Sequence, residues 1–81
     1  MRVVTEFTLY GTSACHLCEL AEAQLSKLVA EGYRFVSNKV DIADDESLMA
    51  RYGILIPVLR RNSDGVELHW PFQPADIAFM L

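Results

Sequence analysis

Two cysteines three residues apart are the side chains of this sequence best suited to covalent chemistry. Cys15-His16-Leu17-Cys18 is a C-x-x-C motif that lies where a strand-like segment passes into a helix-like one. Free backbone N–H groups and the helix dipole stabilise a thiolate there, and can lower a cysteine pKa from about 8.5 to about 7 or below. We therefore expect Cys15 to be the exposed nucleophile, with the lower pKa, and Cys18 to be the partly buried thiol that resolves a mixed disulfide.

A disulfide between these cysteines would contribute little to holding the fold together. A closed loop of four residues stabilises by about 2 kcal/mol in the chain-entropy model, against about 4.7 kcal/mol for a loop of about 100 residues. A disulfide this weak is better suited to reversible oxidation and reduction than to stabilising the fold.

Three other interpretations of the cysteine pair remain open at this point. They are a zinc site, which would need four ligands from Cys15, Cys18, His16 and His69, two inert buried cysteines, and a metal or iron–sulfur site shared between two chains.

The elements that would position the cysteines alternate along the chain in the order β-α-β-α-β-β-α. Strands are expected at 3–10, 33–42, 54–60 and 66–70, and helices at 17–29, from 44 to about 51, and from 74 to 81. Gly32 and Gly53 are placed to end the first two helices. Asp64-Gly65 predicts a hairpin turn, and Pro74 suits the first position of the last helix. The β-α-β unit at the front predicts parallel strands and a right-handed crossover.

Length and charge narrow the class of protein. The 81 residues suffice for one domain, spanning 1–81, with one compact core. A net charge of −4 and the lack of a basic stripe argue against nucleic-acid binding. No segment approaches the roughly 20 apolar residues of a membrane span, and residues 1–10 do not resemble a secretion signal. We expect a cytoplasmic monomer that binds neither nucleic acid nor membranes.

Two segments together resemble the glutaredoxins of the thioredoxin superfamily. The first is the run from Tyr10-Gly11 through Cys15-His16-Leu17-Cys18, which is similar to the loop and motif that begin their first helix. The second leads into their cis-proline loop, and comprises Val40-Asp41-Ile42, Tyr52-Gly53-Ile54 and Ile56-Pro57-Val58-Leu59. The resemblance extends over nearly the whole chain up to Trp70.

The resemblance implies a fold, an activity and a second pair of site residues. The fold would be α/β and thioredoxin-like of the glutaredoxin type, with a four-stranded mixed sheet and helices on both faces. The activity would be that of a small dithiol thiol–disulfide oxidoreductase with Cys15 and Cys18 catalytic and no bound metal or cofactor. The Ile56–Pro57 bond would be cis, and both residues would face Cys15 and bind substrate. Substrates would be protein disulfides or glutathione, with glutathione as a co-substrate or a reductase as electron donor.

Several positions depart from the pattern of the family. Leu9 stands where thioredoxins have a buried Asp, and Ala14 where they have a Trp. Thr12 and Ser13 replace a basic residue common in glutaredoxins, and His69-Trp70-Pro71 replaces their glycine pair. In glutaredoxins, the basic residue and the glycine pair help to hold glutathione, and this sequence lacks both. The alternative functions are a thioredoxin-like binding module and a carrier of an inter-subunit iron–sulfur cluster.

Other titratable residues have simpler interpretations. His16 either stabilises the Cys15 thiolate when protonated or faces solvent in the first turn. Four acidic residues lie near the expected start of the second helix, namely Asp41, Asp44, Asp45 and Glu46. They are expected to cap that helix and face solvent rather than bind metal. His69 is expected to end a strand without a chemical role, Trp70 to pack on the core, and Asp76 to interact with the start of the last helix.

Overall fold

A computed structural model describes residues 3–81, which form seven elements in the predicted order. The strands are β1 (Thr5–Gly11), β2 (Phe35–Asp41), β3 (Val58–Arg61) and β4 (Glu67–His69). The helices are α1 (His16–Ala30), α2 (Glu46–Tyr52) and α3 (Pro74–Phe79). None of the helices in residues 3–81 has the length and apolar character needed to cross a membrane.

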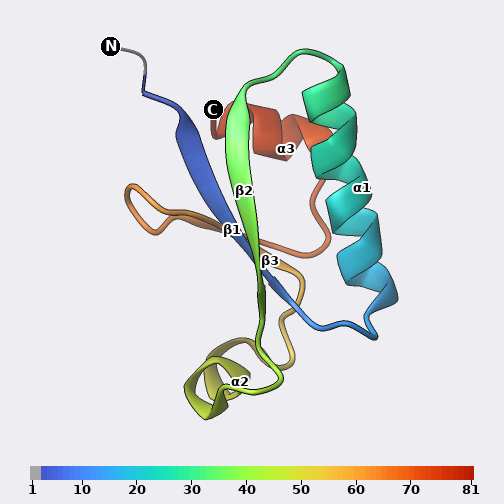
Figure 1. The fold of residues 1–81 in the computed structure, drawn as a ribbon, viewed down its shortest axis with the longest axis vertical. Coiled ribbons are helices and arrows are strands. Elements are labelled where there is room, and N and C mark those ends of the chain that lie inside the picture. The colour runs from blue at the N-terminus through green and yellow to red at the C-terminus, as the bar shows by residue number, and fades with distance from the viewer. Residues whose placement is uncertain (1–2) are drawn as a thin grey trace.

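The four strands form one mixed sheet in the order β2-β1-β3-β4. β1 pairs in parallel with β2, from Thr5 opposite Phe35 to Gly11 opposite Asp41. β3 runs antiparallel to β1, with Tyr10 opposite Val58, and β4 runs antiparallel to β3. The end of β1 and the start of β3 therefore meet at one end of the sheet, the end where α1 begins (Figure 1).

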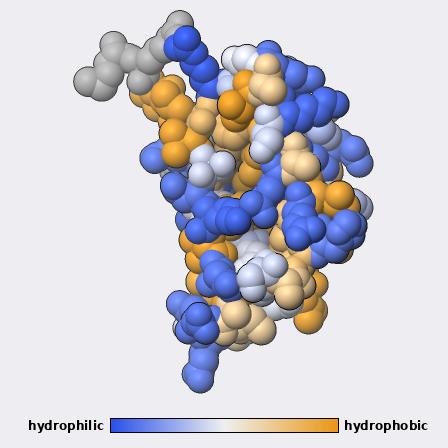
Figure 2. Space-filling model, turned by 45° about the vertical axis from the view of Figure 1, so that its right-hand side comes forward, coloured by the Kyte–Doolittle hydropathy of each residue, from blue (hydrophilic) through white to orange (hydrophobic). Residues whose placement is uncertain are grey.

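Helices cover both faces of the sheet. Alternate residues of β1 point to opposite sides, and both sides carry apolar side chains that pack against helices. Phe7 and Leu9 point toward α1 and α3, whereas Tyr10 points toward α2. The larger cluster on the first face comprises Phe7, Leu9, Ala21, Leu25, Leu28, Leu59, Phe72, Ile77 and Met80. The smaller cluster on the other face is built on Ile42, Tyr52 and Val58. Seen with the α1 side turned forward, the apolar surface is divided into separate patches by polar side chains (Figure 2).

The helix ends follow the signals in the sequence. Gly32, just beyond α1, has φ +98°, a backbone conformation that favours glycine. Asp45 caps α2 by accepting the N–H of Leu48 at 3.0 Å. At α3, the Asp76 carboxylate accepts the Gln73 N–H at 2.7 Å, and Pro74 occupies the first turn. The expected interaction of Asp76 with the start of the last helix is confirmed.

All four expected strands begin later in the structure than the sequence indicated, and β3 differs most. β1 begins at Thr5 rather than at residue 3. β3 begins at Val58 rather than at residue 54, because the chain first makes a turn in which the N–H groups of Leu55 and Ile56 both donate to the Tyr52 carbonyl. Gly53 ends α2 as expected, but with right-handed helical angles of φ −50° and ψ −37°.

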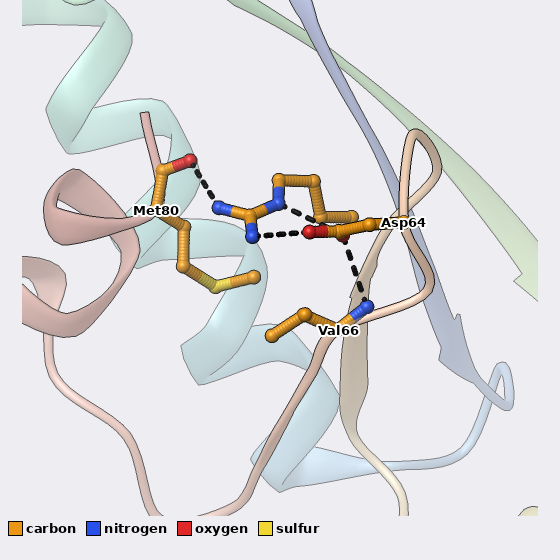
Figure 3. Close-up of polar contacts among 4 residues, drawn as sticks. Asp64, Val66 and Met80 are labelled. Carbon is orange, nitrogen blue, oxygen red and sulfur yellow. Dashed lines mark hydrogen bonds and ion pairs between the residues drawn. The ribbon is translucent and has the colours of Figure 1, made fainter.

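Arg61 joins the β3–β4 turn to the end of α3. Its Nε and Nη2 donate to the two Asp64 carboxylate oxygens at 3.0 and 2.6 Å, and its Nη1 donates to the Met80 carbonyl at 2.9 Å (Figure 3). Asp64 also accepts the Val66 N–H at 3.2 Å. One guanidinium thus ties the hairpin to the last helix of the chain.

These contacts predict how acid should affect stability. The hydrogen bond from Arg61, helped by the Val66 N–H, lowers the pKa of Asp64 from 3.8 to about 2. A carboxyl whose pKa is lower in the folded state stabilises the protein fully above its unfolded pKa, and this contribution is lost as pH falls from about 4 to about 2. Asp64→Asn should therefore remove part of the acid sensitivity of the urea midpoint in that window. Asp44→Asn, an exposed carboxyl on the α2 side, is the control; an equal effect of both variants would contradict the assignment.

Candidate active site

Cys15 occupies the N-cap position of α1. Its backbone is extended, with φ −128° and ψ 106°, and its side chain is partly exposed. Cys15 Sγ accepts a hydrogen bond from the Cys18 N–H at 3.1 Å. A sulfur in this place interacts with a free N–H of the first turn and with the positive end of the helix dipole. In the reduced protein both interactions favour the thiolate, which is the nucleophilic form.

Cys18 lies one turn further along α1 and is only 3% exposed. It is joined to Cys15 by a disulfide, with a Cα–Cα distance of 5.2 Å. The predicted difference in exposure between the two cysteines is thus present in the structure. Their catalytic roles remain predictions.

Gly11, the last residue of β1, allows Cys18 to approach the sheet. A Cβ atom at Gly11 would lie 2.8 Å from Cys18 Sγ and 3.2 Å from its Cβ. The first distance is shorter than real side chains tolerate. The end of β1 therefore has room for the buried sulfur only if residue 11 has no side chain, which explains the glycine at this position.

Replacing Gly11 by alanine should destabilise the oxidised protein by about 1–3 kcal/mol, because overpacking forces the surrounding atoms to shift. The effect should be smaller after reduction, because the Cys18 side chain is then released from the disulfide and can turn away. Urea unfolding of both forms measures this difference. Gly32→Ala is the matched control: its Cβ meets nothing within 4 Å, but φ is +98°, so its loss should be equal in both forms. Equal losses for Gly11→Ala would contradict the account.

Ile56 and Pro57 precede β3 at the same end of the sheet. Their peptide bond is cis, as the resemblance implied. Tyr10 pairs with Val58, so continuing the antiparallel register by one residue places Pro57 across from Gly11, the glycine beside Cys18. Pro57 is fully buried, whereas Ile56 is partly exposed and packs against the smaller cluster. The register brings this segment to the cysteine end of the sheet; its role in binding substrate remains a prediction.

A hollow of about 140 Å³ lies beside Cys18, between α1 and the ends of β1 and β2. An ion pair borders it, with Lys39 Nζ of β2 2.9 Å from Glu22 Oε1 of α1. Neither Glu22 nor Lys39 is recognisable in the sequence as part of a site. Glu22 follows Cys18 by four residues, which places both on one face of the helix, but nothing in the sequence indicated that β2 would bring Lys39 to this face.

His16 and the four acidic residues near the start of α2 lie exposed at the surface, as the simpler of their interpretations expected. The His16 side chain is 79% exposed, and its Nδ1 lies 3.6 Å from a Glu19 carboxylate oxygen. Asp41 accepts the Ala43 N–H at 2.8 Å, and Asp45 caps α2. Within residues 3–81, no group of three or more His, Cys, Asp and Glu side chains is arranged to hold a metal ion.

His69 takes part in a hydrogen-bonded chain that the sequence did not predict. Its Nε2 lies 3.0 Å from Glu67 Oε1, and the buried Tyr52 hydroxyl donates to Glu67 Oε2 at 2.5 Å. Burial and this hydrogen bond raise the pKa of Tyr52 to about 12. The Tyr52 ring also stacks on Tyr10, with ring centroids 4.4 Å apart. These hydrogen bonds therefore connect α2 to β4.

Trp70 packs on the larger cluster, as expected, and its bond to Pro71 is a second cis bond that the sequence did not indicate.

Comparison with known families decides where the chain belongs. The model of the "Glutaredoxin-like domain (DUF836)" matches residues 6–81. The chain belongs to this glutaredoxin-like family. The match includes β1 from residue 6 onward, the Cys15–Cys18 motif and the Ile56–Pro57 segment, so the resemblance drawn from the sequence is confirmed. None of the curated proteins compared matches the chain.

Solved structures of similar proteins support the same glutaredoxin-like fold. A crystal structure of protein XcR50 from X. campestris is 40% identical and has a TM-score of 0.73, over 91% of this chain and 93% of that one. A solution structure of protein Ne2328 from Nitrosomonas europaea is 30% identical, with a TM-score of 0.81, over 100% of this chain and 95% of that one. A malarial protein at 19% identity and a TM-score of 0.68 shares the fold. The thioredoxin-like architecture expected from the sequence is confirmed.

Proposed function

We propose that this glutaredoxin-like protein is a dithiol–disulfide oxidoreductase. The observation that supports this most strongly is the asymmetry of the cysteine pair. Cys15 is partly exposed at the N-cap and accepts an N–H hydrogen bond, whereas Cys18 is 3% exposed and lies within bonding distance of it. One sulfur can reach an external disulfide, and the other can reach only the first sulfur and its immediate surroundings.

Exchange proceeds in two displacement steps. The Cys15 thiolate attacks one sulfur of a substrate disulfide, forms a mixed disulfide with it and releases the other sulfur as a thiolate. The Cys18 thiol then loses its proton and attacks Cys15 Sγ. The bond between Cys15 and the substrate breaks, the Cys15–Cys18 disulfide forms, and the second substrate sulfur leaves. The substrate gains two electrons and the cysteine pair loses two.

The substrates proposed are disulfides of extended protein segments or of glutathione. The Ile56–Pro57 segment supports this, because the register places it beside the end of β1, where an extended chain could pair with its backbone. Glutathione or a reductase of the thioredoxin type returns the electrons.

Turnover of a protein disulfide tests the proposal. Reduced protein should reduce the disulfides of a denatured, oxidised test protein, and catalytic amounts should suffice when either glutathione or a thioredoxin reductase with its cofactor is supplied. Comparing the two donors identifies which one serves this chain. No acceleration above the donor alone, with either donor, would contradict the proposed function.

A further inference from the structure

Resolution of the mixed disulfide requires a proton to leave Cys18, and the surroundings of this residue show where it can go. The inference drawn here rests on the proposed exchange cycle. Cys18 is 3% exposed, so bulk hydroxide has poor access to its thiol. The sulfur instead adjoins the hollow of about 140 Å³, whose volume is sufficient for water molecules. A proton acceptor on this hollow could serve Cys18 through water.

The hollow lies in a groove between α1 and β2. An ion pair spans this groove, with one partner on each of the two elements. A second hollow of about 380 Å³ continues along the same seam and shares Leu9, Glu22 and Lys39 with the first. Glu22 and Lys39, with their oxygen and nitrogen 2.9 Å apart, thus face both hollows from opposite elements. The side chains of both are partly solvated, at 38% and 68% exposure, so a proton that reaches Glu22 can pass on to bulk water.

The charged residues that line the Cys18 hollow are Glu22 from α1 and Lys39 and Asp41 from β2. The part contributed by β1 and the following loop is formed by Leu9, Gly11, Thr12 and Ser13, which offer no ionisable group. Asp41 Oδ1 already accepts the Ala43 N–H at 2.8 Å. Glu22 lies one helical turn after Cys18, on the same face of α1, and Lys39 contacts its Oε1. Among these side chains, Glu22 is the carboxylate best placed to serve Cys18.

We propose that Glu22 accepts the Cys18 proton through water in this hollow during resolution, and that Lys39 stabilises the thiolate that remains. The thiol loses a proton to water, which passes a proton to the Glu22 carboxylate and from there to bulk solvent. Because a carboxylate holds a proton less tightly than a thiolate does, Glu22 acts as a relay and not as a store. The Cys18 thiolate then attacks Cys15 Sγ. Glu22 is thus a positioning residue that acts on Cys18 through solvent.

Stopped-flow mixing with an aromatic disulfide that releases a coloured thiolate separates the two steps. The first release reports attack by Cys15, and the second reports resolution by Cys18. Glu22→Gln should slow the second release by about tenfold to hundredfold near neutral pH, at or below the lower limit of the range for a positioned base, because Glu22 acts through water. The first release should be unchanged. The deficit should shrink as pH rises, because hydroxide, which reaches the buried Cys18 poorly near neutral pH, becomes concentrated enough to take its proton without Glu22. Glu19→Gln, with the same charge change in an exposed residue of α1, is the matched control.

The outcomes separate this inference from the proposed function. If the wild-type protein shows a first release but no second one, the dithiol cycle itself is wrong. If the wild type completes both steps and Glu22→Gln matches it within about twofold at every pH, Glu22 has no part in resolution. A deficit of Glu22→Gln that is the same at all pH values, or that appears equally in the first release, would show a structural effect and would also overturn the inference. Lys39→Met should slow only the second release.

Discussion

Replacing Cys15 by serine is expected to abolish thiol–disulfide exchange, because a serine hydroxyl cannot act as the attacking thiolate near neutral pH. Turnover of a protein disulfide should fall by at least about a thousandfold, to the rate of the uncatalysed donor. Replacing Cys18 by serine should instead preserve the first step. The variant should accumulate mixed disulfides, because attack survives whereas resolution is lost.

Mass spectrometry of each variant after exposure to an oxidised test protein distinguishes these results. The Cys18→Ser protein should carry its substrate as a covalent adduct on Cys15, and the adduct should dissociate on reduction. Limited alkylation of the reduced wild type should also modify Cys15 before Cys18, in keeping with the exposure of the two residues. Adducts on the Cys15→Ser variant but not on the Cys18→Ser variant would reverse the assigned roles.

The largest effect on stability is expected from Phe7→Ala. Phe7 is 0% exposed in the middle of β1, and its ring meets Phe35 edge to face with centroids 5.6 Å apart. Truncating a buried phenylalanine costs about 3–5 kcal/mol, because the transfer free energy is lost and a cavity remains. A domain of this size has a total stability of roughly 4–12 kcal/mol. The variant should therefore be much closer to unfolding at ambient temperature, as a urea or thermal melt would show.

Phe79→Ala is the matched control for this prediction. Phe79 is 93% exposed at the end of α3, so its truncation should change the free energy of unfolding by less than about 0.5 kcal/mol. Similar losses for the two phenylalanine variants would show that the packing between β1 and α1 is not what holds the domain together.

The order of elements and the place of the cysteine motif could be predicted because they depend on local patterns. The apolar period of α1, the Asp64-Gly65 turn and the Pro74 helix start are each encoded within a few residues. The Ile56–Pro57 isomer was predicted in another way, from the resemblance to glutaredoxins. Nothing similar indicated the isomer of Trp70–Pro71, where the family pattern is replaced.

The start of β3 and the groove beside Cys18 could not be predicted, because both depend on contacts between distant segments. Residues 54–57 are apolar and read as strand, yet Leu55 and Ile56 donate to the Tyr52 carbonyl and end α2 with a turn. Glu22 and Lys39 are separated by 17 residues and meet only because β2 pairs in parallel with β1 beneath α1. The register between β1 and β2 determines this contact, and it cannot be read from the sequence of either strand alone.

A redox titration of the cysteine pair tests the central claim most directly. The protein would be equilibrated with thiol–disulfide buffers of graded potential, trapped by alkylation and analysed by mass spectrometry. The account predicts one reversible two-electron transition between the Cys15–Cys18 disulfide and the dithiol, with a midpoint above about −300 mV, where redox-active pairs differ from structural disulfides. A midpoint well below about −300 mV, or a pair that forms no intramolecular disulfide at any potential, would contradict it.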